Sequence, residues 1–229
     1  GQLDLIYRRG IENGLQGLRK IGPEETREIE PHARAVEAVW VPQAGITDYG
    51  LVARQYAKLI EAAGGEIITG VRVQHIEQRT DAVTVTAANW EGSAKKVVTC
   101  GGLYSDKLAR HSGEQPDVQI LPFRGEYYDL KPERAHLVRN LIYPVPNPNF
   151  PFLGVHFTRM IEGGVEAGPN AVLGFRREAY KMWDINVRDL LQYGFYSGFW
   201  RMAAQHWKMG FGEMYRSLSK AAFVKALQK

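Results

Sequence analysis

The feature that most limits how this 229-residue chain can fold is a stretch from Leu121 to Asn170 in which polar and apolar residues alternate. It contains the runs LPFRGEYYDL, LIYPVP, PFLGVHFTRM and VEAGPNAV. A period of two is typical of strands, because successive side chains of a strand point to opposite faces of its sheet. His156 and Thr158 are therefore expected on one face, and Phe157 on the other. We predict an antiparallel sheet with a polar face that forms a pocket wall.

The polar side chains of this stretch suit an anionic small molecule. The candidates for binding and catalysis are Arg124, Tyr127, Tyr143, His156, Thr158, Arg159 and Asn170. An arginine can hold a carboxylate through two parallel N–H donors, and a histidine can act as a base beside a hydroxyl. Structural roles stay open as well. Arg124 can pair with Glu126 or Asp129, and His156 can be a core histidine bonded to the backbone. Residues 168–170, Gly-Pro-Asn, are expected to form a turn.

A glycine turn between a predicted strand and a predicted helix is the second notable feature. The strand is expected over residues 95–99, and it leads through Cys100, Gly101 and Gly102 into a helix that reaches His111. Two glycines let bare backbone approach a ligand closely, and the start of a helix offers free N–H groups. An ordinary strand-to-helix turn has the same pattern, and from this motif alone it is the favoured reading. A single cysteine is more often a small buried side chain than a catalytic thiol.

The remaining chain reads as a mixture of helices and strands. Helices are predicted over residues 3–15, 23–30 and 49–63, and the third is capped by Thr47 or Asp48 and closed by Gly64 and Gly65. Strands are predicted over residues 36–41, 66–69, 71–76 and 83–87. From residue 186 the pattern is helical, with glycines 194, 198, 210 and 212 as interruptions. The predicted fold class is α+β: an α/β part joined to an antiparallel substrate sheet and a helical tail.

The charge of the chain is concentrated in its last part. The whole chain has a net charge of +4, whereas residues 181–229 hold eight basic and three acidic residues, a net +5. The same segment contains Trp183, Trp200 and Trp207. A solvated helical face is the favoured interpretation, and peripheral contact with an anionic membrane or an electron-transport partner is the alternative. Nucleic-acid binding is not expected, because the sequence has no compact basic stripe or known motif.

The location of the protein is expected to be the cytoplasm, with a peripheral position on the inner membrane as the alternative. One cysteine excludes an internal disulfide framework and fits a reducing compartment. No apolar run approaches the ~20 residues that span a bilayer. The first residues, GQLDLIYRRGIENGL, lack the pattern of a signal peptide.

Several motifs in the same order resemble the L-2-hydroxyglutarate dehydrogenase/oxidase family, which consists of FAD-dependent proteins of the D-amino-acid-oxidase-like group. The motifs are GITDYGLVARQYAKLIEAAGGEI, VTCGGLYSD, PFRGEYY, IYPVP, HFTRM with GPNAVLGF, and GFGEMYRSLSKAAFVKALQK. The resemblance covers nearly the whole chain. Several motifs in one order are far more specific than any single one.

The resemblance implies an FAD site and a small dicarboxylate 2-hydroxy acid as the substrate. Val73 would meet the adenine through its backbone, and the cofactor would pass Cys100, Gly101 and Gly102. The family more usually has an alanine in the middle of that turn, so a glycine there is a mild departure. His156 would be the base, Arg124 or Arg159 would hold a carboxylate, and Tyr143 and Thr158 would orient the substrate. Tyr127 and Asn170 complete the predicted wall, and no metal is expected.

Two departures from the family make this chain resemble the middle of a longer flavoenzyme. It has no GxGxxG motif, and the family's closing segment over the flavin is missing. This chain alone is therefore expected to be inactive. We divide it into residues 1–35 (helical part of the substrate domain), 36–118 (partial FAD-binding domain with adjoining strands), 119–185 (antiparallel substrate sheet) and 186–229 (helical part).

Two other functions stay open. One is another flavin-dependent enzyme, either an amino-acid or amine oxidase or a relative of glycerol-3-phosphate dehydrogenase. The other is a non-catalytic fragment that cannot hold FAD, because the FAD pyrophosphate would lack its usual helix N-terminus.

Overall fold

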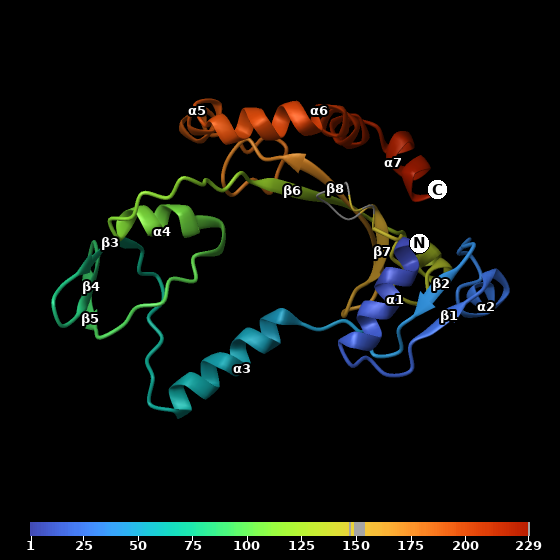
Figure 1. Ribbon diagram of the computed structural model, residues 1–229, viewed down its shortest axis with the longest axis horizontal. Helices are drawn as coiled ribbons and strands as arrows, with labels where there is room; N and C mark the ends of the chain where they lie inside the picture. Colours follow the sequence, from blue (N-terminus) through green and yellow to red (C-terminus); the bar gives the residue numbers. More distant parts are fainter. Residues whose placement is uncertain (147, 149–153, 229) are drawn as a thin grey trace. The chain divides into compact units, whose positions relative to one another are not determined.

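The computed structural model describes residues 1–146, 148 and 154–228, and the chain forms two compact units (Figure 1). The first unit contains Gly1–Tyr49, Gly125–Val172 and Phe211–Lys229. The second contains Gly50–Arg124 and Leu173–Gly210. Helices and antiparallel strand pairs occur together, so the α+β class is confirmed. The four-part division of the sequence stays a prediction.

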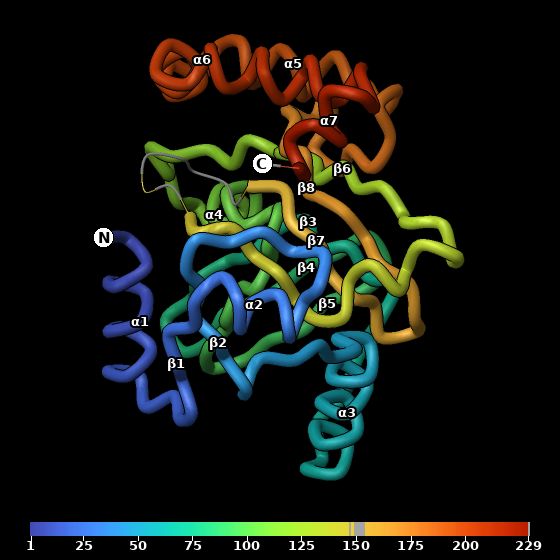
Figure 2. The backbone as a smooth tube through the Cα atoms, turned by 90° about the vertical axis from the view of Figure 1, so that its right-hand side faces the viewer, coloured from blue at the N-terminus to red at the C-terminus, as the bar shows by residue number. Residues whose placement is uncertain are grey.

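The first unit begins with a helix packed on a small two-stranded sheet. Helix α1 (Gln2–Glu12) packs against β2 (Ala38–Trp40), which pairs antiparallel with β1 (Arg19–Ile21) (Figure 2). Helix α2 (Pro23–Ile29) starts with a proline in its first turn, where the missing N–H costs no hydrogen bond. The prediction that the first helix reaches residue 15 is wrong. It ends at Glu12 because Gly14 takes a φ of 79°, which a helix does not allow.

The polar strands predicted from alternation form the second sheet, in the order β6-β8-β7 (Figure 1). The strands are β6 (Phe123–Asp129), β7 (His156–Arg159) and β8 (Val165–Leu173), and β7 pairs antiparallel with β8. A short 3₁₀ helix, η2 (Pro132–Leu137), follows β6. Residues 151–153, the start of the predicted run PFLGVHFTRM, lie outside the described residues.

The turn predicted at residues 168–170 is wrong, because these residues lie inside β8. Gly168 pairs with His156 in the ladder. The chain reverses instead at Gly163 and Gly164, whose φ angles of 94° and 86° suit glycine, and the Met160 N–H donates to the Gly164 carbonyl at 3.2 Å. Because the glycine pair forms the β7–β8 hairpin turn, residues 168–170 can be part of strand β8.

A buried carboxylate ties distant parts of the first unit together. Glu30 is 5% exposed and accepts hydrogen bonds from the backbone N–H of Arg139 at 3.0 Å and from the Asn140 side chain at 2.8 Å. These partners lie about 110 positions further along the chain. The hydrogen bonds satisfy the buried carboxylate oxygens and join segments that are distant in the sequence.

The second unit contains a three-stranded antiparallel sheet and several helices. The sheet consists of β3 (Val73–Gln78), β4 (Val83–Ala87) and β5 (Trp90–Ala94). Helix α4 (Ser105–His111) packs against β3 and follows the 3₁₀ turn η1 (Gly102–Tyr104). Helix α3 (Tyr49–Ala62) precedes the sheet along the chain, within one residue of the predicted bounds.

Two predicted strands of this unit are wrong. Residues 66–69 and 95–99 are not strands, although both contain β-branched residues. A strand needs a neighbour for its N–H and C=O groups, and among the described residues the sheet ends at the pairing of Val83 with Ala94. Ile67, Ile68 and Val98 consequently stay exposed, Val98 to 85%. The glycine turn thus follows irregular chain and not a strand.

The last part of the described chain is helical, as predicted. The helices are α5 (Val187–Gly194), α6 (Ser197–Leu218) and α7 (Lys220–Leu227). Asn186 caps α5 through its side chain, which accepts from the Asp189 N–H at 3.1 Å. The predicted interruptions at glycines 198, 210 and 212 are wrong, because α6 runs through them. Each interior glycine costs a helix about 1 kcal/mol, too little to break one of 22 residues. None of the helices within the described residues is long and apolar enough to cross a bilayer.

Candidate functional site

A polar and aromatic face of the β6-β8-β7 sheet brings several predicted site residues together within the first unit. Pairing across β7 and β8 places His156 opposite Gly168 and Thr158 opposite Glu166, so these side-chain positions share one face. The ring of Tyr143 lies 4.5 Å from the ring of His156, centroid to centroid. Sequence alternation predicted this grouping of histidine, threonine and tyrosine.

Tyr127 joins the same face by lying over glycine backbone. A Cβ atom on Gly168 would be 2.6 Å from Tyr127 Cδ1, and one on Gly125 would be 3.0 Å from its Cε2. Burial, followed by the charge of Glu166 and the nearby Tyr143, raises the pKa of the Tyr127 hydroxyl. The hydroxyl therefore stays protonated near neutral pH and can donate a hydrogen bond.

The imidazole of His156 is held in one tautomer by the backbone. Its Nδ1 lies 3.0 Å from the Gly154 carbonyl oxygen. A carbonyl only accepts, so Nδ1 carries the hydrogen and, in the neutral ring, Nε2 carries the lone pair. The lone pair at Nε2 allows the neutral imidazole to accept a proton as a general base.

The two predicted carboxylate-binding arginines do not gather with these residues. By alternation Arg159 lies on the face opposite Thr158, and its Nη1 donates to the Val138 carbonyl at 2.9 Å. Arg124 belongs to the second unit, where its Nη1 donates to the Lys181 carbonyl at 2.8 Å. The roles of both arginines toward a substrate stay predictions.

Asn170 is fully buried in a network of side chains. Its Nδ2 donates to Glu126 Oε2 at 3.1 Å and to the Glu213 carbonyl at 2.9 Å, and its Oδ1 accepts from Arg216 Nε at 3.1 Å. These contacts use both donors and one acceptor position of the amide. Within the first unit, Asn170 therefore fastens the end of α6 to the sheet, and its contact with a substrate stays a prediction.

The predicted cofactor residues lie in the second unit, around β3 and the glycine turn. Val73 is the first residue of β3, which packs against α4. Gly102 has a φ of 49°, and a Cβ built on it would meet nothing within 4 Å. Gly101 sits tightly against Leu108, whose Cδ1 would be 2.4 Å from a Cβ. Cys100 is exposed and free. The turn therefore has open space beside Gly102 and packs against Leu108 at Gly101.

Three further residues, on the polar face and behind the glycine turn, were not predicted from the sequence. Glu166 shares the polar face, and alternation within VEAGPN could have indicated it. Arg177 and Asp106 form a buried ion pair behind the glycine turn, with Nη1 and Oδ1 2.6 Å apart. These two residues are 71 positions apart, and no local pattern announces such a pair.

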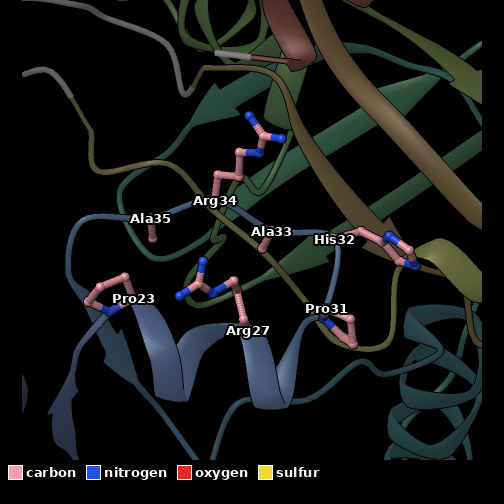
Figure 3. Close-up of a pocket in the computed structure, with 7 residues that line it drawn as sticks. All are labelled: Pro23, Arg27, Pro31, His32, Ala33, Arg34 and Ala35. Atoms are coloured by element: carbon pink, nitrogen blue, oxygen red, sulfur yellow. The ribbon is translucent and has the colours of Figure 1, made fainter.

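A surface hollow of about 610 Å³ in the first unit is separate from the predicted residues. It is lined by prolines, alanines and cationic side chains: Pro23, Arg27, Pro31, His32, Ala33, Arg34 and Ala35. The side chains of Arg27 and Arg34 point in different directions, so they do not converge on one ligand (Figure 3). Among the residues described, no group of three or more metal-ligating side chains comes together.

Comparison with protein families decides the class of this chain: residues 1–197 match the FAD dependent oxidoreductase model. The chain belongs to this family. It is also 49% identical over 228 residues to an L-2-hydroxyglutarate dehydrogenase of Indibacter alkaliphilus, covering 99% of this chain and 57% of that protein. The mitochondrial L-2-hydroxyglutarate dehydrogenase of Homo sapiens is 40% identical, covering all of this chain and 52% of that protein. That of Escherichia coli O17:K52:H18 is 40% identical over 98% of this chain and 53% of its own length. The chain thus spans about half the length of these curated relatives.

The FAD-dependent family assignment agrees with the geometry of the glycine turn. A flat, phosphate-bearing cofactor needs places where backbone approaches it without side chains, and Gly102 offers one. The open backbone at Gly102 in the second unit is therefore compatible with the cofactor of this family.

Proposed function

We propose that this chain takes part in the FAD-dependent oxidation of L-2-hydroxyglutarate to 2-oxoglutarate. The observation that carries the proposal is the face with Tyr127, Tyr143, His156 and Thr158, where the Nδ1–H of His156 is held by the Gly154 carbonyl. The relatives named L-2-hydroxyglutarate dehydrogenase support the substrate.

The role proposed for His156 is to accept the proton of the substrate hydroxyl. Nε2 carries the lone pair for this transfer, and the bond from Nδ1 to Gly154 steadies the imidazolium that forms. The chemistry that FAD supplies when bound is acceptance of the hydride from C2 of the substrate.

The other residues of the face are proposed to orient the substrate. The hydroxyls of Tyr127, Tyr143 and Thr158 can donate hydrogen bonds to its oxygen atoms. Arg124 or Arg159 is proposed to hold a carboxylate, because a guanidinium matches the geometry of that group, and Asn170 is proposed to support the wall from behind.

The residues proposed to hold FAD are Val73, Cys100, Gly101 and Gly102. They fit the cofactor because the turn is open on the Gly102 side and the chain of Val73 lies next to α4. Purification of the complete gene product with stoichiometric yellow flavin supports this assignment, whereas a colourless protein that does not take up FAD contradicts it.

The catalytic proposal predicts that His156→Gln in the complete gene product slows flavin reduction by L-2-hydroxyglutarate about 10²- to 10⁴-fold, the usual contribution of a general base. Glutamine keeps a polar side chain but has no basic nitrogen. The measurement is anaerobic bleaching of the flavin in a stopped-flow spectrometer, with glutamate and glycerol 3-phosphate as comparison substrates.

The matched control is His32→Ala, which removes an exposed histidine of the same unit and should leave the rate within twofold. An unchanged rate in His156→Gln would contradict the role of His156. Faster bleaching with glutamate or glycerol 3-phosphate than with L-2-hydroxyglutarate would contradict the substrate.

We also propose that the protein is cytoplasmic and touches an anionic membrane or electron-transport partner through its basic C-terminal helices. Trp200 and Trp207 of α6 are 60% and 55% exposed, and the Lys208 ammonium lies 5.6 Å from the Trp207 ring centroid. Exposed tryptophans beside cations suit the interface of an anionic bilayer.

A further inference from the structure

We propose that Arg177 is a positioning residue that fixes the glycine turn at residues 100–104 in the shape that receives FAD. The proposal rests on the proposed function, because it takes this turn as a cofactor contact. It adds a residue that touches neither the cofactor nor the substrate and acts through the backbone of Leu103.

The guanidinium of Arg177 joins the turn to the helix behind it. Nη1 donates to the Leu103 carbonyl and to Asp106 Oδ1, both at 2.6 Å, and Nη2 donates to Asp106 Oδ2 at 3.0 Å. The side chains of Arg177 and Asp106 are only 2% and 3% exposed. A buried fork of this kind holds its partners in one relative geometry.

Asp106 is held from its other sides as well. Its Oδ1 accepts from the Lys107 N–H at 2.9 Å, and its Oδ2 accepts from the Ile120 N–H at 3.3 Å. Burial alone would raise the pKa of the Asp106 carboxyl, but the hydrogen bonds and charge of Arg177 outweigh burial and hold that pKa below its usual value. The carboxylate is therefore charged at neutral pH and keeps Arg177 in place.

Arg177 is itself anchored by its backbone and by an aromatic ring. Its N–H donates to Asp189 Oδ2 at 2.9 Å, and Asp189 stands in the first turn of α5. Its guanidinium carbon lies 5.7 Å from the ring centroid of Tyr104, the last residue of η1. Such a ring contact adds a second restraint on the turn.

The turn needs an outside restraint because of its glycines. Gly102 has a positive φ and no atoms near its Cβ position, so no packing restrains it there, and the local bond from Ser105 Oγ to its carbonyl, at 2.8 Å, lies within the turn itself. The bond from Arg177 to the Leu103 carbonyl fixes the peptide between Leu103 and Tyr104, one residue beyond Gly102. Misplacement of a binding group by about 1 Å can cost 10²-fold in function, so this restraint bears directly on cofactor affinity.

A purely stabilising role explains the arrangement less well. Buried ion pairs often contribute no more stability than well-packed apolar side chains of similar volume. An apolar pair at these positions could fill the space, but it could not donate to the Leu103 carbonyl. The guanidinium therefore supplies a hydrogen bond to the turn, from Nη1 to the Leu103 carbonyl, that an apolar side chain cannot replace.

The test uses Arg177→Lys in the complete gene product. Lysine keeps a cation beside Asp106 but cannot span Leu103 and both carboxylate oxygens at once. FAD is titrated into the apoprotein well below its unfolding temperature, and binding is followed by flavin fluorescence. We expect FAD affinity to fall roughly 10- to 100-fold. Hydrogen exchange of the Tyr104 amide, which donates to the Gly101 carbonyl at 2.8 Å, should become faster.

Two matched controls separate positioning from general stability. Arg110→Met removes an exposed cation 3.5 Å from the same carboxylate. Val83→Ala loosens the buried side of β4, whose sheet partners for Val83 are Gln78 and Ala94. Both controls should keep FAD affinity within about twofold, although Val83→Ala lowers the unfolding temperature.

Unchanged FAD affinity in Arg177→Lys would overturn the proposal, and so would an equal loss in Val83→Ala. A wild-type protein that does not bind FAD would instead overturn the proposed function and the cofactor role of the turn with it. The two failures are therefore distinguishable.

Discussion

At the scale of single residues, Gly168 shows how a missing side chain shapes the polar face. The ring of Tyr127 occupies the space that a Cβ atom would need, and the Glu126 carbonyl oxygen would lie 2.8 Å from that atom. The backbone cannot move away easily, because Gly168 is paired with His156 in the β7–β8 ladder.

Gly168→Ala is therefore expected to displace Tyr127 and lower the free energy of unfolding by about 1–3 kcal/mol, as overpacking does. Chemical denaturation measures the loss. Gly45→Ala is the control, since nothing lies within 4 Å of its Cβ position. Equal stability of the two variants would contradict the packing described for Tyr127.

At the scale of elements, the end of α6 is fixed to the sheet of the first unit by a hydrogen-bond network around the Asn170 amide. Asn170 contacts Glu126, Glu213 and Arg216, and Ser217 Oγ donates to Glu126 Oε1 at 2.9 Å. The Ala171 N–H adds a bond to Glu213 Oε2 at 3.1 Å. Loss of the amide would leave buried polar groups without partners.

Asn170→Ala should lower the free energy of unfolding by about 2–4 kcal/mol, because two charge-assisted hydrogen bonds and one bond to a backbone carbonyl disappear together. Amide exchange in residues 211–218 should speed up more than in α1. The exposed Asn13 provides the comparison, and Asn13→Ala should change stability by less than about 0.5 kcal/mol. Uniform exchange across both helices would show that Asn170 does not anchor α6.

At the scale of the whole molecule, the basic C-terminal segment governs the proposed membrane contact. Replacing both Arg201 and Lys208 by alanine should weaken binding to phosphatidylserine vesicles by about 30-fold, at about 1 kcal/mol per cation. Co-sedimentation at low and high salt measures the effect, and high salt should abolish the difference. Lys58→Ala, an exposed lysine of α3, should bind like the wild type. No binding by the wild type would dismiss the membrane contact.

The sequence predicted the parts of this molecule that depend on neighbours along the chain. Alternation placed His156 and Thr158 on one face, because strand geometry imposes that period. Residues 66–69 and 95–99 were predicted as strands from local sequence, but pairing is decided by distant segments. Local sequence likewise could not predict the ion pair between Arg177 and Asp106 or the hydrogen bonds of the Asn170 side chain. The partners in both cases come together only in the folded chain.

The long separations within the first unit have a consequence for how it folds. Glu30 meets Asn140 across 110 positions, and Asn170 meets Arg216 across 46. Closing such loops costs chain entropy before any contact rewards it, so folding of this unit is expected to be slow for its size. During synthesis the N-terminal helices must also wait for residues near 140, and the sheet must wait for the end of α6. During synthesis, the segments of the first unit whose partners are most distant in the sequence therefore keep their apolar surface exposed for longest. These segments are where a chaperone is expected to bind.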